Sequence, residues 1–258
     1  MYCATPLKGI LIGRPSMKIL FILDTILQKR SLWPYTNYCS YYRKETVIAL
    51  SDQNLLLLKK VRWVLKRGLF PAFRGLFLFS FFAGRSLPPL VGKGTTLLYK
   101  RMIRLGRWVF IGNYVSINAY SLNGISLGNR VTIREFGIIQ CSSSVENPGV
   151  GLVVGNNVYI GPRCNIGVGG EIVIGEGTLV GADFTAVAEN HLQTDEGISK
   201  VEVTRNGISI GKNCWIGHRV IILDGVTLGS NSIVGAGSVV TKSFPPGSKI
   251  AGIPARQL

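Results

Sequence analysis

The chain has 258 residues, of which 47% are apolar, and its 29 Lys or Arg against 13 Asp or Glu give a formal net charge of +16. This apolar content is enough for a packed core and excludes a wholly disordered basic tail. Five cysteines without a CxxC pair argue against a disulfide framework or a zinc ribbon, and two histidines exclude a site that takes three imidazoles from one chain.

The positive charge is concentrated in the first 100 residues. They carry 16 Lys or Arg and three acidic residues, whereas residues 101–258 have a net charge of only +3 and hold 25 of the 32 glycines. Two prolines and two glycines in residues 85–94 are typical of a connector. We therefore predict an N-terminal region over 1–100 and a second domain over 101–258.

The N-terminal region contains two apolar stretches. In residues 18–27 Asp24 interrupts the apolar run and no small-residue cleavage site follows, so the pattern does not predict secretion. Residues 61–82 mix Arg and Lys with Phe and Leu, and their apolar run is much shorter than the ~20 residues that span a bilayer. This pattern predicts peripheral attachment to an anionic membrane surface.

Nucleic acid is a competing partner for so much positive charge. No nucleic-acid motif is present, and the aromatic residues cluster with leucines rather than alternating with Lys and Arg as in a stacking platform. The sequence therefore predicts no nucleic-acid partner.

The second domain repeats with a period of six residues. Each aliphatic residue is commonly followed by Gly, and the residue four places on is small or compact. A helix has a period near 3.6 and an ordinary strand a period of two, so neither produces this pattern. The clearest aliphatic positions are Ile210, Ile216, Ile222, Leu228, Val234 and Val240, with earlier copies at Val154, Ile160, Ile166, Ile174 and Val180 and weaker ones at Leu105, Ile111, Ile117, Leu127, Ile133 and Ile139.

Such a hexad is a short strand followed by a corner. The aliphatic side chain points into a narrow prism, the small residue fits beside it, and the next residue turns the chain, often as Gly or Asn with a positive φ. Three hexads close one triangular coil, and stacked coils bury a continuous apolar column. The pattern thus predicts a mainly β solenoid after a partly helical N-terminal region. Because an open solenoid end needs covering, the aromatic helices of 61–82 could equally cap it or line a subunit interface.

The repeats resemble those of the hexapeptide-repeat acyltransferases. The most similar stretches are 208–217, 234–242, 245–247 and 251–256, which resemble the branch of maltose, galactoside, xenobiotic and polysaccharide O-acetyltransferases. The resemblance covers about residues 103–258 by hexad pattern and is specific from His191 onward. It implies a left-handed parallel β-helix, acetyl-CoA as the donor and a homotrimer with active sites between subunits.

The repeat is interrupted by a polar loop over 187–207, and a loop that leaves a solenoid is free of its packing constraint. By resemblance, the family places a catalytic His at the root of this loop, so His191 is the predicted general base. Imidazole suits removal of a proton from a sugar hydroxyl during attack on a thioester, without an acyl-enzyme. Asp183 and Glu189 are the candidate carboxylate partners of His191.

The resemblance also implies the coenzyme site. Trp215 is expected either to line the site of the acceptor and the thioester or to pack against another subunit. The backbone N–H of Gly217 is expected to stabilise the oxyanion of the tetrahedral intermediate. His218 is predicted to be a corner residue with a backbone contact beside the pantetheine arm. Other residues expected to bind the coenzyme are Gly217, Gly235, Ala236, Gly237, Thr241, Lys242 and Arg256.

The sequence thus predicts an acetyl-CoA-dependent O-acetyltransferase without a metal. We expect it to act on a sugar hydroxyl of a surface polysaccharide or its lipid-linked precursor, in the cytoplasm and at the inner face of the plasma membrane. The alternatives are a soluble acetyltransferase for a free sugar, serine or an antibiotic, and a non-catalytic β-helix scaffold. A carbonic anhydrase on the same fold is disfavoured by the two histidines.

Overall fold

The computed structural model describes residues 52–79, 89–141, 146–195 and 197–258. The stretch 18–27 and residues 80–82 of the predicted membrane segment lie outside these ranges. The chain divides into two compact units, Met1–Lys59 and Lys60–Leu258. The boundary predicted at residue 100 therefore falls inside the second unit.

The first described elements are helical. α1 (Asp52–Val64) continues through a π-helical turn, η1 (Leu65–Leu69), into α2 (Phe70–Phe79). The π-turn is closed by the Phe70 N–H, which donates to the Leu65 carbonyl. Pro71 follows directly and has no N–H to donate, so an altered hydrogen-bond pattern at this point costs the helix little.

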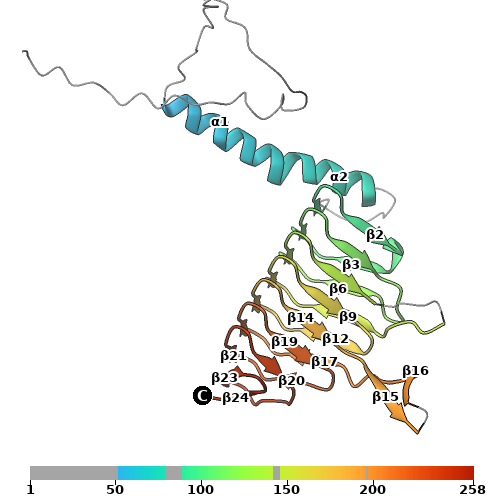
Figure 1. Ribbon diagram of the computed structural model, residues 1–258. Coiled ribbons are helices and arrows are strands. Elements are labelled where there is room, and N and C mark those ends of the chain that lie inside the picture. Colours follow the sequence, from blue (N-terminus) through green and yellow to red (C-terminus); the bar gives the residue numbers. More distant parts are fainter. Residues whose placement is uncertain (1–51, 80–88, 142–145, 196) are drawn as a thin grey trace, which may run out of the picture. The chain divides into compact units, whose positions relative to one another are not determined.

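The rest of the second unit is a left-handed parallel β-helix built from three parallel sheets, as the sequence predicts. Successive strands go to sheets A, B and C in turn, and each coil pairs only with the coils before and after it (Figure 1). Sheet A contains β1 (Leu90–Val91), β4 (Phe110–Ile111), β7 (Thr132–Ile133), β10 (Tyr159–Ile160), β13 (Leu179–Val180), β18 (Trp215–Ile216), β21 (Ile233–Val234), β23 (Lys249–Gly252) and β24 (Ala255–Gln257). Sheet B contains β2 (Thr96–Leu98), β5 (Ser116–Asn118), β8 (Ile138–Gln140), β11 (Asn165–Gly167), β14 (Thr185–Val187), β19 (Ile221–Leu223) and β22 (Val239–Val240). Sheet C contains β3 (Ile103–Leu105), preceded by the 3-10 turn η2 (Lys100–Met102), and β6 (Ile125–Leu127), β9 (Gly151–Val154), β12 (Glu171–Ile174), β17 (Ile208–Ile210) and β20 (Thr227–Leu228).

The solenoid begins earlier than the composition predicts. Its first strand is β1 at Leu90, and Gly92 and Gly94, expected in a connector, form the first corner. Gly92 must be Gly because a Cβ there would lie 2.3 Å from the carbonyl carbon of Gly112 in the next coil. At this end of the solenoid the backbones of successive coils are therefore already stacked in close contact.

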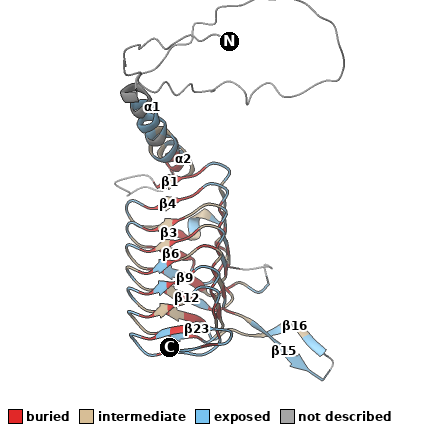
Figure 2. Cartoon of the chain, turned by 60° about the vertical axis from the view of Figure 1, so that its left-hand side comes forward, coloured by how far each residue is buried: buried red, intermediate tan, exposed pale blue. Residues whose placement is uncertain are grey.

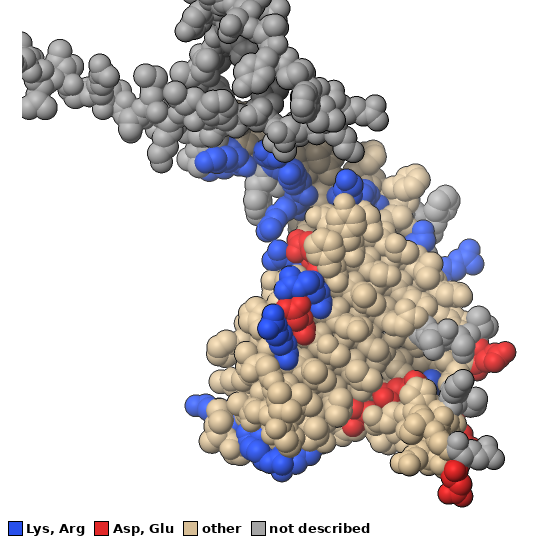
Figure 3. All heavy atoms as spheres, viewed as in Figure 1, with Lys and Arg blue, Asp and Glu red and all other residues tan. Residues whose placement is uncertain are grey.

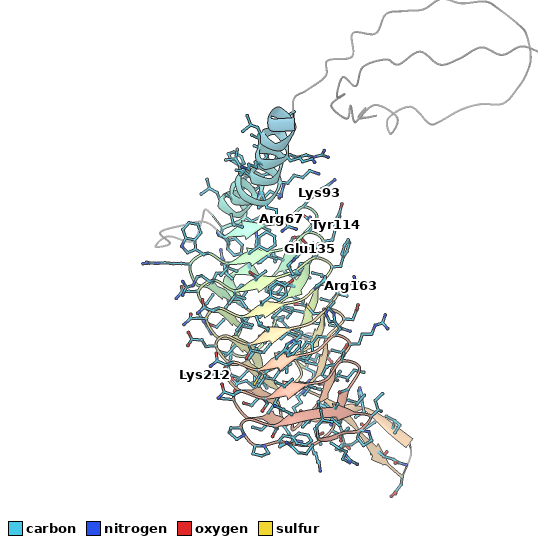
Figure 4. The ribbon with its side chains drawn as sticks, turned by 90° about the vertical axis from the view of Figure 1, so that its left-hand side faces the viewer. Arg67, Lys93, Tyr114, Glu135, Arg163 and Lys212 are labelled. Carbon is cyan, nitrogen blue, oxygen red and sulfur yellow. The ribbon has the colours of Figure 1, made fainter. Side chains whose placement is uncertain are left out.

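The corners differ from the prediction in one respect. The residue with positive φ precedes the small core residue instead of following it, as Asn213 precedes Cys214. This position also accepts large side chains, because they point outward and stack from coil to coil. Tyr114 and Phe136 stack with ring centroids 5.4 Å apart, and Arg163 follows along the same edge (Figure 4).

The predicted aliphatic positions form the buried core of the prism (Figure 2). One coil departs from the pattern, because Phe184 is fully buried where other coils place Cys164 or Val220. The same coil has Ala186 in register with two larger residues, Ile166 and Ile222. The small alanine leaves room for the ring, so the volume of the layer is conserved.

Both ends of the solenoid are covered. α2 packs against the first coil with the side that carries the buried residues Pro71, Gly75 and Phe79. The Arg74 Nε also donates to the Val91 carbonyl at 2.9 Å. At the other end, β24 folds back antiparallel on β23 and buries Ala255. The helical cap that the sequence leaves as an alternative is therefore present in α2.

Candidate active site

The loop predicted over 187–207 is an antiparallel hairpin of β15 (Asn190–Thr194) and β16 (Gly197–Thr204). It leaves the solenoid after β14 of sheet B and projects from the coils (Figure 1). The chain rejoins the solenoid at β17. His191 lies on β15, near the root of the hairpin, and is exposed.

The geometry of His191 determines which ring nitrogen can act as a base. Its Nδ1 lies 2.9 Å from the Ser199 carbonyl oxygen. A carbonyl oxygen can only accept, so the neutral ring carries its proton on Nδ1 and donates it to Ser199. The lone pair of Nε2 is then available to accept a proton from a substrate.

The root of the hairpin is held by ionic and charge-assisted hydrogen bonds. Arg205 donates from Nε to a Glu189 carboxylate oxygen at 2.7 Å and from Nη1 to the Pro148 carbonyl at 3.0 Å. The Asp224 carboxylate accepts from the N–H groups of Asn206 and Gly207 at 3.0 and 2.8 Å. These bonds join the two ends of the hairpin to each other and its C-terminal end to the solenoid, so they fix where His191 stands.

Neither carboxylate expected beside His191 is its partner. Glu189 pairs with Arg205, and Asp183 pairs with Arg163 through hydrogen bonds of 2.6 and 2.8 Å. The Arg163 guanidinium lowers the pKa of the Asp183 carboxyl, since it stabilises the ionised form. That expectation is wrong, and the backbone carbonyl of Ser199 takes the place of a carboxylate.

A pocket of about 180 Å³ lies at the root of the hairpin. Its walls combine amide, carboxylate and guanidinium groups with exposed backbone, a mixture suited to hydrogen-bonding hydroxyl groups. The lining residues are Gln140, Cys141, Asn147, Gly167, Val168, Gly169, Val187, Glu189 and Arg205.

The predicted coenzyme residues around Trp215 stand at another corner of the prism. Gly217 and His218 lie where the chain passes from β18 of sheet A into β19 of sheet B, whereas the hairpin leaves at the end of β14. The strands of sheet B are parallel, so their starts and their ends lie at opposite sides of the sheet. One chain therefore does not bring His191 together with Gly217.

His218 makes the backbone contact that the sequence predicts. Its Nδ1 accepts the Ala182 N–H at 3.1 Å, so the neutral ring carries its proton on Nε2. Nδ1 is engaged and Nε2 can only donate. The tautomer of His218 is thus opposite to that of His191, and it does not suit a general base.

The prediction that the Gly217 N–H stabilises an oxyanion is wrong for this chain. That N–H donates to the Val234 carbonyl at 2.8 Å, and Gly217 is buried. The N–H groups of Gly235 and Gly237 are also used, by the carbonyls of Ile250 and His218. The exposed Ala236 between them has no N–H partner in the part of the chain that the structure describes.

Trp215 faces outward and is 59% exposed. In sheet A it lies in register between Leu179, also exposed, and Ile233. These three side chains form an apolar strip on the outer surface. Both expectations for Trp215, a substrate wall and a subunit contact, place it on such a surface.

The expected phosphate-binding residues are exposed. Thr241 and Lys242 follow β22, at the side of sheet B where the hairpin also leaves, and the Lys242 Nζ lies 5.6 Å from the centre of the Phe244 ring. Arg256 lies on β24 and donates to the Ala255 carbonyl. No carboxylate among the described residues forms a salt bridge with Lys242 or Arg256.

We predict that the buried thiols are unreactive. Burial raises the pKa of Cys141 and Cys164 to about 11, so very little thiolate is present at neutral pH. Iodoacetamide at pH 7.5 should leave both residues unmodified in the native chain and modify them after unfolding, as read by peptide mass spectrometry. Rapid alkylation of Cys141 in the native chain would contradict this prediction and would make Cys141, which lines the pocket, a candidate nucleophile.

Residues 207–242 match the family described as bacterial transferase hexapeptide (six repeats). The chain is 37% identical over 108 residues to galactoside O-acetyltransferase of Escherichia coli, a match that covers 42% of this chain and 53% of that protein. The chain spans about half the length of the curated relatives that it matches.

Many solved structures are similar to this chain. One of them is a mutant of AntD, an N-acyltransferase from Bacillus cereus, in complex with dTDP and coenzyme A, with a TM-score of 0.48, 23% identity and coverage of 60% of this chain and 82% of that one. Another is a mutant of perosamine N-acetyltransferase from Caulobacter crescentus in complex with coenzyme A and GDP-perosamine, with a TM-score of 0.40, 19% identity and coverage of 72% and 63%.

Proposed function

We propose that this hexapeptide-repeat chain is an acetyl-CoA-dependent O-acetyltransferase that modifies a sugar hydroxyl. The observation that carries the proposal is the distance of 2.9 Å between His191 Nδ1 and the Ser199 carbonyl oxygen, from which we infer that Nδ1 carries the proton and Nε2 is left as a base on an exposed hairpin. The similarity to galactoside O-acetyltransferase supports the reaction class.

In the proposed reaction the hydroxyl oxygen attacks the thioester carbonyl. The Nε2 of His191 accepts the hydroxyl proton as the new C–O bond forms, while Nδ1–H remains bonded to Ser199. The tetrahedral intermediate then loses the coenzyme thiolate, which takes the proton from Nε2. An acetyl ester and free coenzyme A are the products, and the imidazole returns to its starting state.

The pocket at the hairpin root is the proposed place of the acceptor. Its polar groups include Gln140, Asn147, Glu189 and Arg205. The salt bridge between Glu189 and Arg205 also holds the base of the hairpin. Sugar hydroxyls are bound by such amides and ion pairs because each group can donate or accept. Glu189, which lines the pocket, directly precedes β15, the strand that carries His191.

The coenzyme would be bound by Ala236, at the side of sheet B opposite the hairpin, and by two C-terminal cations, of which Lys242 follows β22 on the hairpin side. The Ala236 N–H, which has no hydrogen-bond partner among the described residues, can donate to a pantetheine carbonyl, and Lys242 and Arg256 can bind phosphates. Because His191 and Ala236 belong to opposite sides of sheet B, a complete site would combine two copies of the chain. This supports the homotrimer with sites between subunits.

A second part of the proposal concerns the identity of the acceptor and the location of the enzyme in the cell. We place the acceptor in a surface polysaccharide or its lipid-linked precursor and the enzyme in the cytoplasm, at the inner face of the plasma membrane. The strongly basic N-terminal region, which lies outside the resemblance, supports this location. Among the described helices, none is long and apolar enough to cross a membrane.

Coenzyme binding is testable by calorimetry without knowing the acceptor. We expect the full chain to bind coenzyme A, and Lys242→Gln with Arg256→Gln to lower the affinity by tenfold or more, since each change removes a charged hydrogen bond to phosphate. The matched control is Arg130→Gln with Lys212→Gln, two exposed cations at another corner, which should bind as the wild type does. No detectable binding by the wild type would favour the scaffold and contradict the proposal.

A further inference from the structure

We propose that the outward face of α2, with the cations around it, binds the surface of an anionic phospholipid bilayer. This goes beyond acyl transfer and does not depend on it. The outward face is defined by five residues spaced at helical intervals: Leu69, Phe70, Phe73, Leu76 and Phe77.

α2 presents its apolar side to solvent. Its small residues Pro71 and Gly75 face the first coil, and a Cβ on Gly75 would overlap the Pro89 carbonyl, so this close contact fixes which side faces out. On the outward face Phe73 is 72% and Phe77 78% exposed. A helix of an isolated soluble domain has the reverse polarity, so this face is expected to have a partner.

The apolar surface continues toward the solenoid. A hollow of about 320 Å³ lies between α2 and the first coil. Phe73, Phe77 and Leu78 line it from the helix, and Gly92, Gly94 and Thr95 from the coil. The rings of Phe73 and Phe77 therefore stand at an open, mostly apolar recess rather than in a closed core.

The charges around this face are predominantly positive, although one carboxylate, Glu135, pairs with Arg134 and interacts electrostatically with Arg67. Residues 53–134 contain no Asp or Glu. Exposed cations lie on the helices before the face and on the first coils after it. Figure 3 shows Lys and Arg along the upper part of the described surface, with acidic groups beside the lower ones. They include Lys60, Arg62, Lys66, Arg67, Lys93, Arg101, Arg104 and Arg107, of which Arg104 donates to the Asn123 carbonyl.

Charge complementarity selects the occupant. A second copy that packed the same face against this one would bring cations mainly against cations, because residues 53–134 contain no Asp or Glu and the neighbouring Glu135 already pairs with Arg134. Residues 1–51 are also net basic, with seven Lys or Arg against Asp24 and Glu45. An anionic bilayer fits both the charge and the exposed apolar surface, because its headgroups attract the cations and its acyl region accepts exposed Phe and Leu side chains.

Vesicle sedimentation of the full chain tests this proposal. With vesicles of phosphatidylcholine containing roughly one third phosphatidylglycerol, we expect binding that weakens as salt is raised, and little binding to phosphatidylcholine alone. Phe73→Ser with Phe77→Ser should lower the affinity more than tenfold, since both rings lose their insertion into the bilayer. Arg62→Gln with Lys66→Gln should lower it about fivefold per cation and reduce the salt dependence.

The controls separate lipid binding from folding and from catalysis. Lys212→Gln with Lys249→Gln removes two exposed cations from late coils, away from this face, and should sediment as the wild type does. The Phe73 and Phe77 side chains are exposed, so the double variant should keep its thermal unfolding midpoint and its binding of coenzyme A in solution. Wild-type binding that ignores lipid charge and salt, or equal binding by the phenylalanine variant, would overturn the proposal. A lower mass of that variant in lipid-free ultracentrifugation would also overturn it, because a second copy would then cover the face.

Discussion

Replacement of His191 by Gln is expected to lower kcat for acetyl transfer by about 10²–10⁴-fold, the usual contribution of a positioned general base. Gln has a similar length but no nitrogen lone pair that can take the hydroxyl proton. His191 is exposed, so the substitution opens no cavity and should leave the fold unchanged. The KM for acetyl-CoA should change little, because the lost interaction belongs to the transition state.

The rate is measured as thiol release from acetyl-CoA in the presence of a sugar acceptor, with a galactoside as the first probe. Gln193→Ala is the matched control, since Gln193 is exposed on the same strand and should keep nearly the full rate. Full activity of the His191 variant would contradict the mechanism. An equal loss in both variants would mean that the hairpin, rather than the imidazole, limits the reaction.

Replacement of Phe184 by Ala is expected to destabilise the β-helix by about 3–5 kcal/mol. The ring is fully buried, and the neighbouring Ala186 cannot fill the space that it leaves. The backbone cannot collapse into that space either, because the coil is hydrogen-bonded on both sides, through Ile166 and Ile222. The measurement is urea unfolding followed by circular dichroism.

Phe136→Ala is the control for this prediction. Phe136 is 56% exposed and stacks on Tyr114, so its loss should cost no more than about 1.5 kcal/mol. The comparison is between the same substitution inside and outside the prism. Equal losses of stability would contradict the view that the buried column holds the coils together.

The six-residue period predicts the core because only the aliphatic position points inward in every coil. It also held a signal for the true start of the solenoid. Val91 and Leu97 are six residues apart and are followed by Ile103, and Val91 is followed by Gly92. Pro88 and Pro89 lie just before Val91 and Gly92, so the composition of this stretch is typical of a connector. The sequence prediction followed this composition rather than the six-residue period.

The details of the site depend on contacts that spacing does not encode. Glu189 and Arg205 form a salt bridge across the base of the hairpin. The sequence did not predict this pair, because it did not show which residues of the loop pair with each other as β15 and β16. The Ser199 carbonyl reaches His191 because of an irregularity in the pairing of β15 and β16. The Gly217 N–H is bonded to the Val234 carbonyl of the next coil. Spacing alone does not reveal this hydrogen bond, because Val234 becomes a neighbour of Gly217 only after the chain has passed through all three sheets.

The most direct measurement of the central claim is the O-acetyl content of the surface polysaccharide in the strain that encodes this chain. Acetate released by mild base is compared among the parent, a deletion strain, and deletion strains that carry the wild type or the His191→Gln chain. We expect the deletion to remove one class of O-acetyl ester, the wild type to restore it, and the variant to fail although the protein is present at the same level. O-acetylation that is unchanged by the deletion, or that the variant restores in full, would contradict the account.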